Sequence, residues 1–214
     1  MNQVNKTDPT KERILNEAEA LFAQKGYHAV SVREITTAAE CNLAAINYHF
    51  GNKENLYIEV FRSRWVPRAR RVRACFGESL AAQDEVSPKA VAQALAEAFL
   101  KGPLSDEERQ RHHQLMVREL GQPTKAFDLV AEQILRPFFK GLAETLRSVM
   151  PEALDEEHLL LNVLSTFAVV LYFNFARVAV TRITGREYDE EFKALLVEHI
   201  AKFCRRGLEG NQGG

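Results

Sequence analysis

A short run of polar and small side chains has the composition of a surface that recognises DNA bases. Asn47, Tyr48 and His49 follow one another, and Ala44 and Ala45 lie just before them. Amide, phenol and imidazole groups can form hydrogen bonds with base edges and phosphates. A short helix that presents such side chains on one face fits the major groove of DNA. This stretch therefore predicts contact with double-stranded DNA.

Further candidates for DNA contact flank this run. Leu43 favours an apolar contact, for example with a thymine methyl group, whereas Arg33 and Lys53 suit phosphates. Amide-rich starts of short helices also attract phosphates without adding net charge. The complete predicted set of DNA-binding residues is Arg33, Asn42, Leu43, Ala44, Ala45, Asn47, Tyr48, His49 and Lys53.

Two short helices must position these side chains. Ser31 and Glu34 have the spacing of a capping box, which predicts a helix that starts at Val32. Asn42 is a good N-cap for a second helix, in which apolar residues recur every three or four positions, at Leu43, Ile46 and Phe50. Only two or three residues separate the helices, so the pattern predicts a helix-turn-helix.

The run from Asn42 to Tyr57 resembles the DNA-binding signature of the tetracycline-repressor (TetR) family of bacterial transcription regulators. Upstream positions match the same family at Arg13-Ile14-Leu15, Ala18, Leu21-Phe22, Gly26-Tyr27 and Val30 to Ile35, so the resemblance covers roughly residues 8 to 60. One departure is Glu40, which stands where the family usually has glycine in the turn. A residue other than glycine at positive φ costs on the order of 1 kcal/mol, so we expect a slightly rearranged turn.

The whole chain reads as an all-α protein of about nine helices and no strands. We predict a helix-turn-helix DNA-binding domain over 1–53, a linking helix over 54–75, and a helical effector-binding and dimerisation domain over 76–214. The first helix is expected from about Thr10 to Lys25, where Gly26 ends it. Asn52 should cap the linking helix, which Pro67 should bend or interrupt.

Local signals also mark helices in the second half of the chain. Ser87-Pro88 begins a helix that Gly102-Pro103 ends, and Ser105 with Glu108 forms another capping box. A long helix is expected over 124–149, and Pro137 must kink it.

The segment from Asp155 to Ile183 is unusually apolar, as is one face of the last expected helix, 188–206. Polar residues interrupt the first segment too often for a membrane span, at Asn162, Ser165, Thr166, Asn174 and Arg177. We therefore expect no membrane insertion, and a homodimer through a four-helix bundle instead, an arrangement that the resemblance also implies. The candidate interface residues are Phe167, Leu171, Phe175, Phe192, Leu196, His199 and Phe203.

Charge gives little support to a DNA partner. The 214 residues carry a formal net charge of −1, and residues 1–60 hold six Lys or Arg against eight acids. Strong nonspecific DNA binders have basic surfaces. A run of six arginines without an acid lies between 62 and 73, and it can either face phosphates or form a solvated helix flank.

A small apolar or aromatic effector is the third expected partner, after operator DNA and a second copy. Its candidate contacts are Phe99, His112, Met116, Phe127, Phe138, Phe139 and Phe173, although aromatic residues at helical spacing are commonly plain core. His112 and His113 are adjacent and lack a further ligand at i+4, so no metal site is expected. No cofactor is expected either. Cys41 is either a small apolar residue that packs in the turn or an oxidation switch.

These features predict a cytoplasmic, ligand-responsive transcriptional repressor that binds a palindromic operator as a homodimer. The polar start of the chain has no secretory signal. The sequence contains neither a phosphate-binding glycine loop nor a nucleophile elbow, so no motif indicates an enzyme. Two alternatives stay open: a helical ligand-binding or interaction module that has lost DNA binding, and a transcriptional activator of the same fold.

Overall fold

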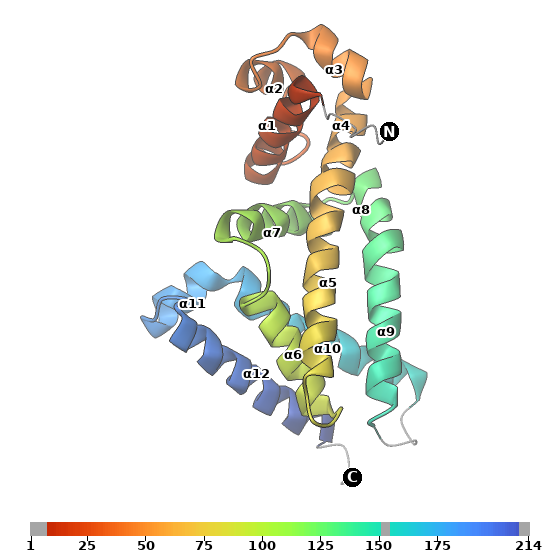
Figure 1. Cartoon of the computed structure of the whole chain (residues 1–214), viewed down its shortest axis with the longest axis vertical. Coiled ribbons are helices and arrows are strands. Elements are labelled where there is room, and N and C mark those ends of the chain that lie inside the picture. The colour runs from red at the N-terminus through yellow and green to blue at the C-terminus, as the bar shows by residue number, and fades with distance from the viewer. Residues whose placement is uncertain (1–7, 151–154, 210–214) are drawn as a thin grey trace, which may run out of the picture. The chain divides into compact units, whose positions relative to one another are not determined.

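The computed structural model describes residues 8–150 and 155–209, and within these ranges the chain is helical without strands (Figure 1). Twelve α-helices and two π-helical segments, η1 and η2, follow one another. Each π segment joins two α-helices, so the described chain forms ten continuous helices. The predicted all-α class is confirmed, and the expected number of helices was close.

Contacts divide the chain into two compact units that are not contiguous in sequence. The first unit comprises Met1–Ala69 and Leu104–Ile134, and the second comprises Arg70–Pro103 and Leu135–Gly214. The predicted bounds 1–53, 54–75 and 76–214 follow motifs rather than contacts, and they remain a prediction.

The first unit begins with three helices around a small apolar core. They are α1 (Pro9–Lys25), α2 (Val32–Ala38) and α3 (Leu43–Phe50), and α1 packs against both others (Figure 1). Ile14, Phe22, Ile35 and Ile46 are fully buried between them. Asp8 caps α1 and Gly26 ends it at φ 85°, close to the expected bounds.

The remaining helices of this unit come from two separate parts of the chain. They are α4 (Lys53–Val60), η1 (Phe61–Trp65), the first turn of α5 (Val66–Ala81), α7 (Asp106–Gly121), α8 (Lys125–Val130) and most of η2 (Ala131–Leu135). Helix α7 packs against α1, and α8 packs against α4. Residues 106–134 therefore fold with the helix-turn-helix region, which the motif-based division did not anticipate.

Each π segment ends two residues before a proline. η1 ends at Trp65, before Pro67, and η2 ends at Leu135, before Pro137. Proline lacks the N–H that would bond to the carbonyl four residues earlier, and its ring presses against that carbonyl. A local widening of the helix relieves this conflict. Both helices therefore continue through their prolines, so the interruption that Pro67 could have caused does not occur, and the bends at Pro67 and Pro137 stay predictions.

The second unit is built around α6 (Pro88–Leu100), which packs against α9 (Arg136–Arg147), α10 (Glu156–Phe175) and α12 (Glu190–Glu209). A short α11 (Arg177–Thr184) follows α10, and Gly185 ends it in the left-handed conformation. The core includes Val91, Leu95, Leu100 and Ile200, all fully buried. Ser87 caps α6 and Ser105 forms a complete capping box with Glu108 on α7, as predicted.

Candidate DNA-binding surface

Helix α3 presents two chemically different faces. Ile46 and Phe50 point into the core of the first unit, at 0% and 8% exposure. Leu43 and Tyr48 are 54% and 84% exposed, and Ala44 and Asn47 are exposed as well. The solvent-facing side therefore combines apolar, amide and phenol groups, as a helix that contacts base edges requires.

Local hydrogen bonds fix the ends of α3 and of its neighbours. The Asn42 side chain accepts a hydrogen bond from the Ala45 N–H at 3.0 Å, and Asn52 accepts from Asn55 N–H at 2.8 Å at the start of α4. Both predicted N-caps are therefore confirmed. Asn42 is exposed, but its Oδ1 already serves the cap, so its amide NH2 group is the part left for a DNA contact.

The turn before α3 holds Glu40 in a strained left-handed conformation, where a slightly rearranged turn was expected. Among the described residues other than glycine, Glu40 alone has a positive φ, 48°. The next residue, Cys41, donates its N–H to Thr36 O at 3.0 Å, which closes a Schellman-type end of α2. Glu40 therefore takes the position that glycine usually occupies. Cys41 is partly buried and not in a disulfide.

The capping box predicted for α2 is half present. Ser31 accepts a hydrogen bond from Glu34 N–H at 3.1 Å. The Glu34 carboxylate instead pairs with Lys25, the last residue of α1, and this pairing lowers the Glu34 pKa. A neighbouring cation at the end of α1 therefore replaces the return bond to the Ser31 backbone.

Two of the predicted DNA-binding residues turn toward their own unit. The His49 side chain is 10% exposed, and its Nε2 lies 3.7 Å from Asp8 Oδ2. Lys53 Nζ lies 4.4 Å from the centre of the Tyr27 ring, and burial lowers the pKa of this ammonium group. Arg33, in contrast, is exposed. The exposed part of the predicted set is thus Arg33, Asn42, Leu43, Ala44, Asn47 and Tyr48.

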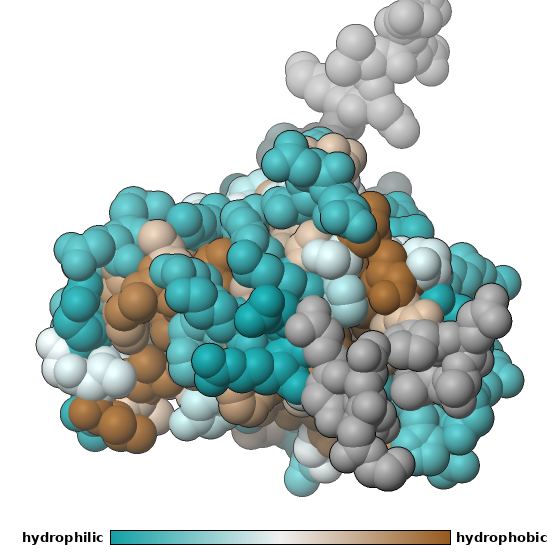
Figure 2. Space-filling view, turned by 90° about the horizontal axis from the view of Figure 1, so that it is seen from below, coloured by the Kyte–Doolittle hydropathy of each residue, from teal (hydrophilic) through white to brown (hydrophobic). Residues whose placement is uncertain are grey.

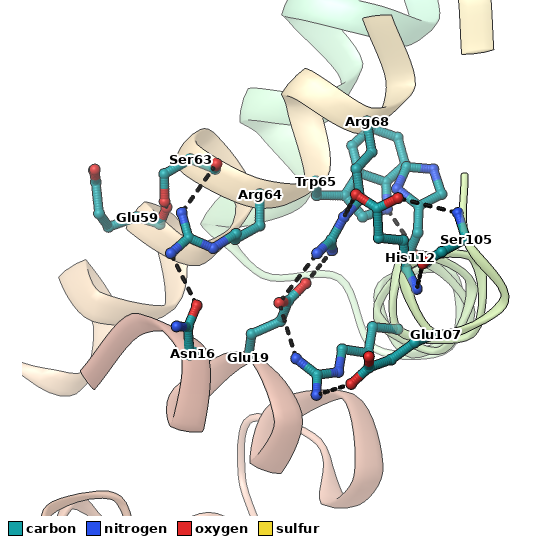
Figure 3. Close-up of polar contacts among 12 residues, drawn as sticks. Asn16, Glu19, Glu59, Ser63, Arg64, Trp65, Arg68, Ser105, Glu107 and His112 are labelled. Carbon is teal, nitrogen blue, oxygen red and sulfur yellow. Dashed lines mark hydrogen bonds and ion pairs between the residues drawn. The ribbon is translucent and has the colours of Figure 1, made fainter. Parts of the chain in front are cut away.

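Two members of the arginine run, Arg64 and Arg68, make contacts inside the first unit, whereas Arg62, Arg70, Arg71 and Arg73 are exposed. Arg64 contacts Glu12 at 2.5 Å. It also contacts Asn16 at 3.0 Å, and Arg68 pairs with the buried Glu19 (Figure 3). Arg62 pairs with Glu59 one helical turn before it. A phosphate role is therefore disfavoured for Arg64 and Arg68, which join the linking helix to α1.

Helix α7 completes this polar junction. Arg111 lies 3.5 Å from Glu19 and 2.5 Å from Glu107, so two arginines share the Glu19 carboxylate. The Trp65 indole donates a hydrogen bond to His112 O at 2.9 Å, and the two rings stack with centres 4.3 Å apart (Figure 3). Burial and the nearby cation Arg68 lower the pKa of His112 to about 3. This histidine is therefore neutral at pH 7.

The predicted effector contacts divide among three environments in the two units. His112, Met116 and Phe127 belong to the first unit. In the second unit, Phe138 and Phe139 contact Phe167 with ring centres 5.6 and 5.0 Å apart, and Phe99 contacts the same ring at 5.5 Å. Phe173 instead lines an open groove between α10 and α12. Sequence spacing could not separate these three environments.

The predicted dimer residues also divide. Phe192 and Leu196 are 4% and 5% exposed and belong to the core of their own unit, and Phe167 packs inside the aromatic cluster. Leu171 and Phe175 are partly buried, whereas His199 and Phe203 are exposed. Phe192 and Leu196, predicted as dimer contacts, are instead buried in their own unit, because the apolar face of α12 packs largely against α6.

Sequence reasoning missed most of the apolar surface of α10. Leu161, Leu164, Ala168 and Tyr172 are exposed at helical spacing. Hydrophobic residues also reach the surface between polar stretches in Figure 2. On α12, exposed Leu195, His199 and Phe203 continue at intervals of four residues. We call these seven residues the apolar stripe. In each helix these residues recur at helical spacing, at positions different from the apolar residues that are buried. This second periodic row of residues is the sequence signal that could have identified them.

Helix α10 is also the one described helix that is long and apolar enough to cross a membrane by length and composition. The same composition suits a helix that is covered on one side by its own core and on the other by a partner. It is therefore weak evidence for a membrane span.

Comparisons with known proteins identify both parts of the chain. Residues 14–60 match the family described as bacterial regulatory proteins, tetR family. Residues 88–211 match the C-terminal domain of the HTH-type transcriptional dual regulator CecR. The CecR protein of Shigella flexneri is 26% identical over 212 residues, which cover 96% of this chain and 94% of the relative. The regulator QacR of Staphylococcus aureus is 38% identical over 58 residues, 26% of this chain and 31% of QacR.

Solved structures agree on the fold. The fatty acid degradation regulator FadR from Bacillus halodurans superposes with a TM-score of 0.61 at 20% identity, covering 95% of this chain and 98% of FadR. A tetR-family regulatory protein from Rhodococcus RHA1 gives 0.64 at 16% identity, with coverage of 94% and 98%. The helix-turn-helix geometry and the two family matches lead to one conclusion: the chain belongs to the TetR family of transcriptional regulators, with a C-terminal domain of the CecR type.

Proposed function

We propose that this regulator is a homodimeric repressor that binds a palindromic operator and is released by a small apolar or aromatic effector. The observation that carries the proposal is the division of α3, whose Ile46 and Phe50 side is buried while Tyr48 and Leu43 are exposed. A single short helix contacts few base pairs. Specific recognition therefore needs two helix-turn-helix domains, one from each subunit, that bind half-sites about 34 Å apart. We expect the protein to reside in the cytoplasm, where its DNA partner lies.

The apolar stripe supports the second copy as its partner. A monomer rarely exposes a contiguous row of large apolar side chains without a use for it. Two such stripes, each from α10 and α12, can form a four-helix bundle around a two-fold axis. The dimer face in this proposal is Leu161, Leu164, Ala168, Tyr172, Leu195, His199 and Phe203.

The effector is proposed to contact the aromatic cluster of the second unit, which consists of Phe76, Phe99, Phe138, Phe139 and Phe167. Aromatic walls favour apolar and aromatic ligands. If ligand binding disfavours the DNA-bound arrangement, ligand and operator weaken each other by the same factor. Screening small aromatic compounds against a preformed operator complex tests this step, and Phe139→Ala should remove the response without changing basal DNA affinity.

Operator binding itself is tested by sequencing the genomic fragments that the purified protein retains and then measuring affinity for the recovered site. Tyr48→Ala and Asn47→Ala should weaken binding by about 1 to 3 kcal/mol each, the usual value of a good base contact. Leu120→Ala on α7 is a matched control, since Leu120 is 57% exposed but lies outside α3. Unchanged affinity in both α3 variants would favour the alternative, an interaction module that has lost DNA binding.

Activation is the second candidate for the sign of regulation. The full-length relative CecR is described as a dual regulator, and other relatives over the DNA-binding region are described as repressors. The sign depends on where the operator lies relative to the promoter. Mapping that position, together with transcript levels in a deletion strain, separates the two.

A further inference from the structure

An arginine of α7 binds the end of α1. Arg118 Nε donates a hydrogen bond to Ala23 O at 2.9 Å, and its NH2 group donates to Gln24 O. These are carbonyls of the last turn of α1, which have no partner inside the helix. A cation at this end also interacts favourably with the helix dipole. Arg118 therefore acts as a C-terminal cap supplied by a residue 95 positions away from Ala23.

The backbone after α1 leaves room for this guanidinium. Gly26 has a φ of 85°, and a Cβ built on it would lie 3.1 Å from one terminal nitrogen of Arg118 and 3.3 Å from its Cδ. A side chain at this position would be strained and would also press on the arginine. Gly26 thus both ends α1 and admits Arg118.

The next residue of α7, Glu119, contacts α4, the second helix that packs against α3. The Glu119 carboxylate is buried at 1% exposure and accepts hydrogen bonds from Tyr57 OH at 2.7 Å and Thr124 N–H at 2.9 Å. Tyr57 lies on α4, which follows α3 directly. Consecutive residues of α7 therefore contact α1 and α4, and both of these helices pack against α3.

We propose that Arg118 is a positioning residue for operator binding: it holds α1, and through α1 the helix α3, in the arrangement that fits the major groove. The proposal rests on the DNA-binding function proposed above. Residues 14–60 match the DNA-binding family. The proposal adds to the DNA-binding part of the protein a residue from the C-terminal half of the chain, Arg118.

The geometry explains why an arginine is needed. Its planar fork donates two charge-assisted hydrogen bonds in fixed directions, whereas a lysine ammonium is a point charge with rotatable donors. Two such bonds fix both the position and the tilt of the last turn of α1. A functional site must be held within a fraction of an ångström, so loosening α1 should weaken the specific complex more than nonspecific binding, which tolerates many arrangements.

The test compares three variants with the wild type by fluorescence anisotropy at low temperature, using operator and random duplexes over a range of salt concentrations. Arg118→Gln removes both the charge and the planar guanidinium donors, whereas Arg118→Lys keeps the charge alone. Arg147→Gln is the charge-matched control, because Arg147 is exposed on α9 in the second unit. Melting temperatures are recorded in parallel.

We expect Arg118→Gln to bind the operator about tenfold more weakly than Arg147→Gln, and Arg118→Lys to lose about threefold relative to wild type. Affinity for random duplex and the salt dependence should match the control, because Arg118 neutralises no phosphate. A residue that only stabilises the fold would lower the melting temperature without this selective loss.

Operator affinity in Arg118→Gln equal to that of Arg147→Gln overturns the proposal, whatever the melting temperatures. If Arg118→Gln does not fold, full operator affinity in Arg118→Lys overturns it equally. A wild-type protein with no preference for any duplex refutes the proposed function instead, so the two failures are distinguishable.

Discussion

In the unit that carries α3, buried charged side chains join helices that lie far apart in the sequence, whereas the second unit is held by aromatic and aliphatic contacts. Glu19 is 1% exposed and pairs with Arg68 and Arg111. The second unit instead buries a continuous apolar core and still exposes the apolar stripe. Buried ion pairs hold the first unit in one defined geometry. The second unit leaves apolar side chains exposed, which suits the proposed contact with a second copy.

The difference has a physical origin. Charge-assisted hydrogen bonds are directional, and leaving a buried charge unpaired is costly, so the polar junction tolerates few arrangements. Apolar contacts are non-directional and scale with buried area. A helix that reads DNA bases needs positional accuracy. The second unit, proposed to bind an effector and a second copy, would instead gain from contacts that can shift and repack.

The largest expected effect concerns the apolar stripe. Leu164→Glu places a charge on a side chain that is 43% exposed in one chain and buried in the proposed dimer. We expect a folded monomer by light scattering and a loss of operator affinity of about a hundredfold or more, because the two heads no longer bind together. Val178→Glu on α11, where Val178 is 70% exposed, is the control. A Leu164→Glu protein that remains dimeric would contradict the assignment of the stripe.

A smaller effect concerns the neutral His112. Its folded pKa of about 3 lies below the ordinary value near 6.5. Between these values the unfolded chain binds a proton that the folded chain does not, so stability falls as the pH decreases through this range. From pH 6.5 to 5 the loss should be about 2 kcal/mol in the unfolding of the first unit.

His112→Phe keeps a ring against Trp65 and should flatten this pH dependence in urea denaturation. His158→Phe on α10 is the control, because the His158 side chain is 63% exposed and lies in the second unit. An equally steep pH profile in the His112→Phe protein would assign the acid sensitivity to other groups.

The smallest effect compares one left-handed residue from each unit. Glu40 has a φ of 48° and Gly185 a φ of 69°, and a Cβ at Gly185 meets no atom within 4 Å. Glu40→Gly should raise the unfolding free energy by at most about 1 kcal/mol, and Gly185→Ala should lower it by about the same amount. Thermal unfolding of both variants measures the change. A destabilised Glu40→Gly protein would show that the glutamate side chain contributes a contact of its own.

The sequence alone determined the parts of the fold that depend on neighbours within one helical turn. The caps at Asn42, Asn52 and Ser105 and the end of α1 at Gly26 are all local features, and each is present. The helix-turn-helix and the all-α class followed from them, together with the resemblance carried by residues 8 to 60. Local signals suffice here because hydrogen bonds in helices and turns join residues only a few positions apart.

Only the tertiary structure decided which side chains contact other parts of their own chain and which remain free to contact DNA or a second copy. His49 and Lys53 turn toward Asp8 and Tyr27, and Arg68 serves Glu19 rather than phosphates. Phe192 faces its own core. These outcomes depend on contacts between residues tens of positions apart, such as Arg68 with Glu19 or Arg118 with Ala23. Composition and periodicity state that a helix has a polar or an apolar face, but the packing of the other helices selects what that face meets.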